Sequence, residues 1–174
     1  MTGTPIRLGL VGAGAIWNGL GGTATPHDPK DFAVALLARE VPGARPLRWR
    51  SDALPVGERV VGVVAWQEIE GRALDVGMPV VQDCAVRDFD PGGGETPVNY
   101  LTDCDLGPVG SGGHILTNVG GEWATSGIFS TSGGKLSVGR SFSRRLGSYT
   151  RAIGIDGGVV AALAEAVAAL RRSD

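Results

Sequence analysis

The sequence predicts a single α/β domain over residues 1–174, with a mixed sheet that is antiparallel in its C-terminal part and a C-terminal helix packed across it. Three observations lead to this prediction. The chain has 174 residues, about the size of one ordinary domain. Its 43% hydrophobic and 20% charged residues provide enough apolar side chains for a folded core. Valine-rich runs of strand length are followed by a final apolar stripe of helical period.

Charge and hydropathy limit the classes of partner. The formal net charge is −2, so there is no basic field to hold nucleic acid or an anionic membrane. No run of about 18 apolar residues occurs, and the first twenty residues lack a charged segment followed by a cleavable apolar one. We therefore expect a cytoplasmic protein without a nucleic-acid or membrane partner.

The first half of the chain predicts three strands and one helix. Residues 6–16 form an apolar run that ends in glycines, which is typical of a buried strand entering a tight turn. Residues 31–40 predict a helix, because their apolar positions fall on one helical face. Residues 46–50 alternate as a half-exposed strand does. Residues 59–69 have a continuous valine-rich core, which favours a strand buried on both faces.

The second half predicts further strands, separated by glycine-rich turns. We place them at residues 77–86, 98–101, 114–119, 123–131 and 135–144. Alternate positions of the last strand, from Ser137 to Ser143, are serine or glycine, and such a face lets a ligand or another backbone approach closely. The predicted sheet includes residues 6–12, 59–68 and 135–143.

The chain is predicted to close with an amphipathic helix. Asp156 is a natural N-cap for it. The apolar stripe consists of Val160, Leu163, Val167 and Leu170, and most other positions are alanine. Helices of this kind pack against a sheet or a partner subunit, so we expect a homo-oligomer.

Two cysteines are the first candidates for chemistry. Cys84 and Cys104 are twenty residues apart and lack the CxxC spacing of a zinc or redox site, so we expect reduced thiols. Both follow an aspartate, which raises a thiol pKa and favours a small buried residue over a nucleophile. Cys84 is nevertheless retained as a catalytic candidate.

Glycine makes up 29 of the 174 residues, and the richest stretch leads to a second set of candidates. His114 follows Ser111, Gly112 and Gly113 at the head of a predicted strand. Ser111 and His114, with Asp103 or Asp105, are a candidate nucleophile, base and orienting group. We expect His114 to be partly accessible and to line the main pocket with residues near Cys84 or Trp123. The alternative is a strand histidine that only satisfies a backbone carbonyl.

Cofactor and metal signals are weak. Gly12 and Gly14 follow a strand as in a dinucleotide-binding turn, but Trp17 replaces the small residue that this turn requires. His27 is expected in a surface loop. Five aspartates near the loop-rich stretch could bind a hard cation, although solvated carboxylates are the favoured interpretation. These are Asp83, Asp88, Asp90, Asp103 and Asp105. We therefore predict no cofactor and no metal.

Three segments of the N-terminal third resemble the opening of β-ketoacyl synthases and their chain-length-factor partners. They are RLGLVGAGAIWNGLGG, FAVALL and GARPLRW, within about residues 7–50, and the DFDP at residues 88–91 is similar to a turn of that family. The resemblance implies part of a thiolase-like fold and an accessory subunit that handles a small acyl substrate or meets an acyl carrier. The alternative function is a non-catalytic assembly module that self-associates through the C-terminal helix and the serine/glycine strand face.

Overall fold

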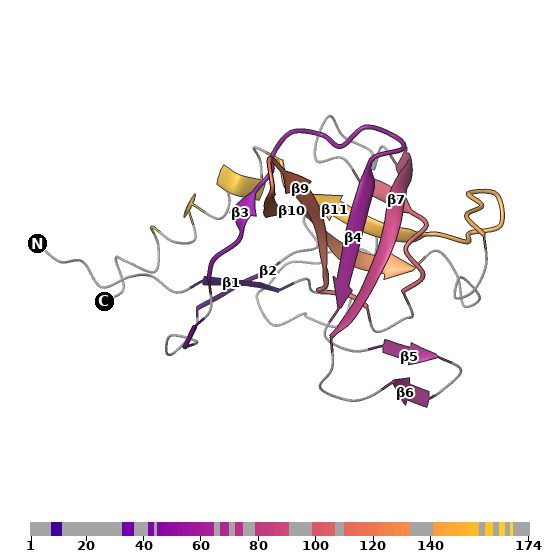
Figure 1. Cartoon of the computed structure of the whole chain (residues 1–174), viewed down its shortest axis with the longest axis horizontal. Helices are drawn as coiled ribbons and strands as arrows, with labels where there is room; N and C mark the ends of the chain where they lie inside the picture. Colours follow the sequence, from indigo (N-terminus) through magenta and orange to yellow (C-terminus); the bar gives the residue numbers. More distant parts are fainter. Residues whose placement is uncertain are drawn as a thin grey trace, which may run out of the picture.

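The described part of the chain is built almost entirely of strands, and six of them close into an antiparallel β-barrel (Figure 1). The structure is a computed structural model. It describes residues 8–11, 33–36, 42–43, 45–64, 67–69, 72–74, 79–90, 99–106, 110–132, 141–156, 159–161, 164–165 and 168.

Each barrel strand pairs with a neighbour on both sides. The strands are β4 (Arg59–Val64), β7 (Val80–Asp90), β8 (Asn99–Thr102), β9 (His114–Val119), β10 (Glu122–Ser132) and β11 (Thr150–Gly154). Around the barrel the order is β4, β7, β8, β11, β10, β9, and β9 returns to β4. The β10–β11 pairing closes the sheet on itself, which removes the edges that an open sheet would expose.

The other strands lie outside the closed barrel. β3 (Arg48–Trp49) pairs with β10 in parallel. β1 (Leu8–Val11) pairs with β2 (Ala33–Leu36), and β5 (Gln67–Ile69) pairs with β6 (Arg72–Leu74), each as a separate two-stranded sheet.

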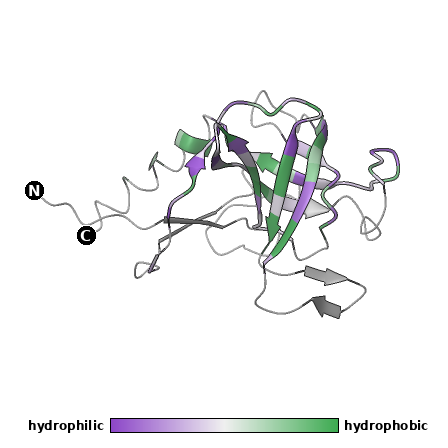
Figure 2. Ribbon diagram, viewed as in Figure 1, coloured by the Kyte–Doolittle hydropathy of each residue, from purple (hydrophilic) through white to green (hydrophobic). Residues whose placement is uncertain are grey.

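Alternation along the strands fills the barrel interior. On β4, Val60, Gly62 and Val64 are buried, whereas the positions between them are half-buried, and the strand is hydrophobic along most of its length (Figure 2). The core consists of Leu54, Val60, Val64, Cys84, Val86, Tyr100, Cys104, Leu106, Ile115, Phe129 and Ala152. Register shifts in β7 and β10 bend these long strands, so that they curve around this core.

Gly62 makes room for Phe129, the largest of the fully buried side chains. A Cβ atom at this position would lie 3.2 Å from Phe129 Cζ and 3.3 Å from Cys104 Sγ. The absence of a side chain on β4 therefore lets the phenyl ring and the sulfur occupy the middle of the barrel.

The α/β prediction is wrong, and residues 31–40 show why. A helix was expected there, but Ala33–Leu36 is a strand that pairs antiparallel with Leu8–Val11. A short apolar run fits a helical face and a buried strand equally well, and its partner decides between them. The valine-rich segment is buried on one face rather than two, because it turns only one face to the barrel interior. The thiolase-like fold that the resemblance implies is also contradicted.

The C-terminal prediction is only partly right. The Val159 N–H donates to Asp156 Oδ1 at 2.9 Å, and the Val160 N–H donates to Asp156 O at 3.0 Å, so the N-cap is confirmed. Val159 is buried, however, while Val160 is 37% exposed, so the stripe is wrong at its first position. Leu163, Val167 and Leu170 lie outside the described residues, as does most of the predicted strand over 135–144.

No helix within the described residues is long and apolar enough to cross a bilayer.

Candidate functional site

Ser111 lies in the turn that immediately precedes β9, and its side chain is exposed. Its hydroxyl donates a hydrogen bond to the main-chain O of Ser130 at 2.7 Å. The Gly112 N–H donates to Phe129 O, and the Phe129 N–H donates to Gly113 O, both at 2.8 Å. Three hydrogen bonds therefore hold this turn against β10.

The two residues after Ser111 must be glycines for different reasons. Gly112 has φ +88°, a conformation that residues with a side chain rarely adopt. At Gly113 a Cβ atom would lie 2.5 Å from the Val63 O and would clash with Val64 Cγ1. The turn is thus packed directly on β4, and it presents the Ser111 hydroxyl to solvent from a rigid support.

His114 is not bound to Ser111. The ring Nδ1 lies 3.1 Å from Thr125 Oγ1, while the Ser111 hydroxyl donates its hydrogen bond to the main-chain O of Ser130. His114 is half-buried, so the expected partial accessibility is confirmed. Burial lowers the pKa of His114 below its ordinary value of 6.5, because a charged imidazolium is less well solvated there.

The two candidate orienting groups hold the barrel together. Asp103 Oδ1 accepts a hydrogen bond from the Ala85 N–H at 2.6 Å, and its Oδ2 accepts one from Arg87 Nε at 2.6 Å. The Asp105 N–H donates to Gln82 Oε1 at 2.5 Å. The Ser111 hydroxyl bonds to Ser130, the His114 ring bonds to Thr125, and the Asp103 carboxylate binds Ala85 and Arg87, so Ser111, His114 and Asp103 do not form a triad.

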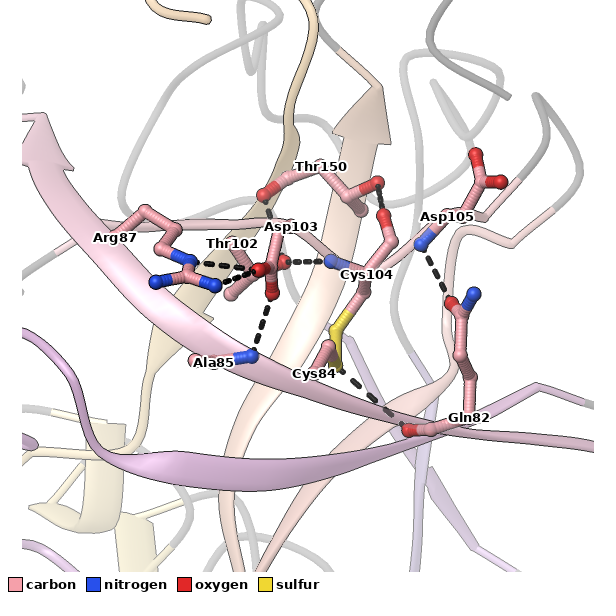
Figure 3. The surroundings of a disulfide bond; sticks show 9 residues. All are labelled: Gln82, Cys84, Ala85, Arg87, Thr102, Asp103, Cys104, Asp105 and Thr150. Atoms are coloured by element: carbon pink, nitrogen blue, oxygen red, sulfur yellow. Dashed lines mark hydrogen bonds and ion pairs between the residues drawn. A yellow bond between two sulfur atoms is a disulfide. The ribbon is translucent and has the colours of Figure 1, made fainter. Parts of the chain in front are cut away.

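Cys84 is joined to Cys104 by a disulfide, with the two Cα atoms 5.0 Å apart (Figure 3). The expectation of reduced thiols is therefore wrong. β7 and β8 are neighbours in the barrel, so residues twenty positions apart in sequence are brought within bonding reach. The Cys84 sulfur is buried and bonded, which leaves no free thiol for attack on a substrate.

Cys84 and His114 point to opposite sides of the barrel wall. Their partners on β4 are Val60 and Val63, three positions apart and therefore on opposite faces. Cys84 belongs to the interior core, whereas His114 is on the outer side with Thr125. His114 and Cys84 therefore do not line one pocket, whereas the β9–β10 register places Trp123, the other expected neighbour, on the same face as His114.

Aspartates of the predicted acidic cluster pair with arginines. Asp88 Oδ2 lies 2.8 Å from Arg144 Nη1, and Asp90 Oδ2 lies 2.5 Å from Arg151 Nη2. The Phe89 N–H and then Arg144 lower the pKa of Asp88. Burial lowers the pKa of Arg151. Within the described residues no three histidine, cysteine, aspartate or glutamate side chains come together as a metal site.

Sequence analysis missed the groups that hold Ser111 and His114. Ser130 contributes its main-chain O, and Thr125 contributes its hydroxyl, both from β10. Every residue has a main-chain carbonyl, so the sequence cannot show which one accepts the hydrogen bond from Ser111. Thr125 lies eleven residues from His114, and only the β9–β10 register brings the two together.

The sequence matches no known family model and no curated protein. The functional argument therefore depends on the geometry of the described residues.

The lowered pKa of His114 predicts a loss of stability in mild acid. Below about pH 6.5 the unfolded chain binds a proton at this position that the folded chain resists, so the free energy of unfolding falls as the pH drops. His114→Gln removes this proton. We expect the melting temperature of H114Q to fall less than that of the wild type between about pH 7.5 and pH 5.5. H27Q is the matched control, and an equal fall in wild type and H114Q would contradict the prediction.

Proposed function

We propose that the chain handles an acyl substrate, with the Ser111 hydroxyl attacking the substrate carbonyl carbon. One observation supports this proposal above the others, namely an exposed hydroxyl held on a rigid turn between glycines. Gly112 has a positive φ, and Gly113 admits no side chain, so both positions require glycine and the turn has one defined conformation.

The chemistry requires a base in addition to Ser111. In the proposed step a bond forms between Ser111 Oγ and the acyl carbon, and the bond to the alcohol or thiol leaving group breaks. The hydroxyl proton passes to the base and then to the leaving group. The Ser130 O orients the hydroxyl but is not basic enough to take its proton. His114 is turned toward Thr125, so the base in this proposal is another group of the chain or of a partner.

The substrate class is a small ester or thioester, and an acyl carrier would supply the thioester form. Phe129 and the disulfide occupy the barrel interior, so a substrate cannot enter it. The exposed Ser111 would therefore meet its substrate at the protein surface. Surface chemistry of this kind suits an acyl group attached to a larger carrier.

Intact-mass spectrometry after incubation with an activated acyl thioester tests the proposal. We expect one acyl group to add to the wild type and at least tenfold less to Ser111→Ala, because the attacking oxygen is lost. Ser51→Ala is the matched control, since Ser51 is also exposed. It should be acylated as the wild type is.

The two lysines, Lys30 and Lys135, are the competing acceptors. An ester on Ser111 is cleaved by hydroxylamine, whereas an amide on lysine is not, and peptide mapping locates each. Equal acylation of S111A and wild type, or acylation of lysine alone, would refute the proposal. The non-catalytic assembly module would then be the better interpretation.

A further inference from the structure

β3 lies at the end of the sheet, and its second edge has no partner among the described strands. It pairs only with β10, where Trp49 lies beside Thr125. The Arg50 N–H donates to Thr125 O at 3.0 Å. Because the backbone groups of successive residues point to alternate edges of a strand, the N–H and C=O of Trp49 point away from β10.

Apolar side chains surround this unpaired edge. Leu47, Trp49 and Trp123 are 43%, 40% and 47% exposed, and we call these three residues the β3 surface. Trp49 shares a face with Thr125 across the parallel register. Side chains two positions apart on a strand point to the same face, so Leu47 lies on the face of Trp49, and Trp123 lies on the face of Thr125. Two exposed indole groups beside a free strand edge are typical of a surface that another strand covers.

We propose that the β3 surface is a self-association surface, on which β3 of a second copy adds antiparallel to β3 of the first. The twofold axis passes beside Trp49, so each Trp49 lies opposite the Trp49 of the second copy. In an antiparallel pair, opposed residues that point their backbone groups inward exchange two N–H···O bonds. This arrangement satisfies the free backbone groups of both copies and places the indole groups side by side.

The charges on the other face of β3 suit a second copy of the chain. Arg48 Nη1 lies 3.0 Å from Glu122 Oε2. Arg50 lies 2.9 Å from the carboxylate of Asp52 and 3.0 Å from that of Glu58. The proposed register sets Arg48 opposite Arg50 of the second copy, and each arginine arrives with its own carboxylate. In each copy both arginines are already neutralised by carboxylates of their own chain, so the two copies meet with little net charge, whereas a strongly charged partner would find no unpaired charge on this face.

The small size of the surface sets the strength of the dimer. Three exposed side chains and two backbone hydrogen bonds per pair of copies are typical of the smallest specific interfaces, below about 1,200 Å² in total. We therefore expect reversible association with a dissociation constant on the order of 10 μM.

Sedimentation equilibrium of the full chain from about 1 μM to about 500 μM tests the proposal, since this range spans the expected constant. The wild type should change from monomer to dimer across it. Trp49→Pro removes the outward-pointing N–H but retains the bond from Arg50 to Thr125, and Trp123→Lys alters only the apolar face. Each variant should weaken the dimer at least tenfold. Leu146→Lys, at a 68% exposed position of the turn over 144–147, is the matched control and should dimerise as the wild type does.

A cross-link distinguishes this register from other forms of association. Under mild oxidation Trp49→Cys should form an intermolecular disulfide, because opposed Cα atoms in such a pair are about 5.5 Å apart. Leu146→Cys should not. Circular dichroism must show that each variant retains the wild-type fold. A wild type that stays monomeric, a dimer that both W49P and W123K leave unchanged, or equal cross-linking of W49C and L146C would overturn the proposal.

Discussion

Replacing Gly113 with alanine is expected to lower the free energy of unfolding by about 3 kcal/mol. The added methyl group would lie 2.5 Å from the main-chain O of Val63 and against Val64 Cγ1. The carbonyl belongs to a paired strand of the barrel, so it cannot move without disturbing β4. The turn must instead lift from the barrel, and its hydrogen bonds to Phe129 are lost.

Urea unfolding, followed by tryptophan fluorescence, measures this cost. Gly120→Ala is the matched control, because a Cβ atom there meets nothing within 4 Å and only its φ of +62° opposes the substitution. The G120A substitution should lower the free energy of unfolding by about 1 kcal/mol. If the urea unfolding curves of G113A and G120A had the same midpoint and slope, the turn would not be packed on β4.

Removing the disulfide is expected to have an effect of similar size. The bond closes a loop between cysteines separated by 20 positions, and its loss in Cys84→Ala/Cys104→Ala should cost about 3 kcal/mol through the greater freedom of the unfolded chain. Both cysteines are buried, at 6% and 2% exposure, so a mild reductant should act only after the barrel opens.

The same variant measured with and without reductant provides the control. The unfolding free energy of the wild type should fall toward that of the double alanine variant when reductant is present throughout the unfolding equilibrium. The double variant itself should not respond to reductant. If the wild type and C84A/C104A were equally stable without reductant, the disulfide would contribute nothing to the fold.

These two predictions concern connected parts of the barrel. Cys104 is held by the disulfide, and its main-chain O accepts a hydrogen bond from Thr150 Oγ1 at 2.6 Å. Asp105 is anchored to Gln82 in the same stretch.

The candidate site was predictable only where the chemistry is local. Gly112 and Gly113 before His114 indicated a sharp turn, and the structure places the exposed Ser111 in that turn. The pairing of His114 with this serine depended on proximity in sequence. In the structure the register between β9 and β10 places the His114 and Thr125 side chains on the same face of the sheet, where they form a hydrogen bond. Cys84 and Cys104 were both expected to be reduced thiols, because their spacing matches no local motif, and only the pairing of β7 with β8 brings them together.

Several elements follow from the sequence alone. The segment 114–119 between glycine-rich turns and the valines that begin at Val60 predict strands that the structure contains as β9 and β4. Gly120 and Gly121, both with positive φ, make the predicted hairpin turn between β9 and β10. Asp156 caps its helix as expected. Each of these features depends on residues within a few positions of one another, so local preference is sufficient to determine it.

The tertiary structure decided the rest. Whether Ala33–Leu36 became helix or strand depended on Leu8–Val11, and the closure of the barrel depended on β11 reaching both β8 and β10. The disulfide likewise depended on β7 and β8 lying side by side. In each case the stabilising hydrogen bonds or covalent bond join residues about twenty or more positions apart. No local pattern encodes which distant partner a strand will meet, and that choice determines which side chains fill the barrel and which face solvent.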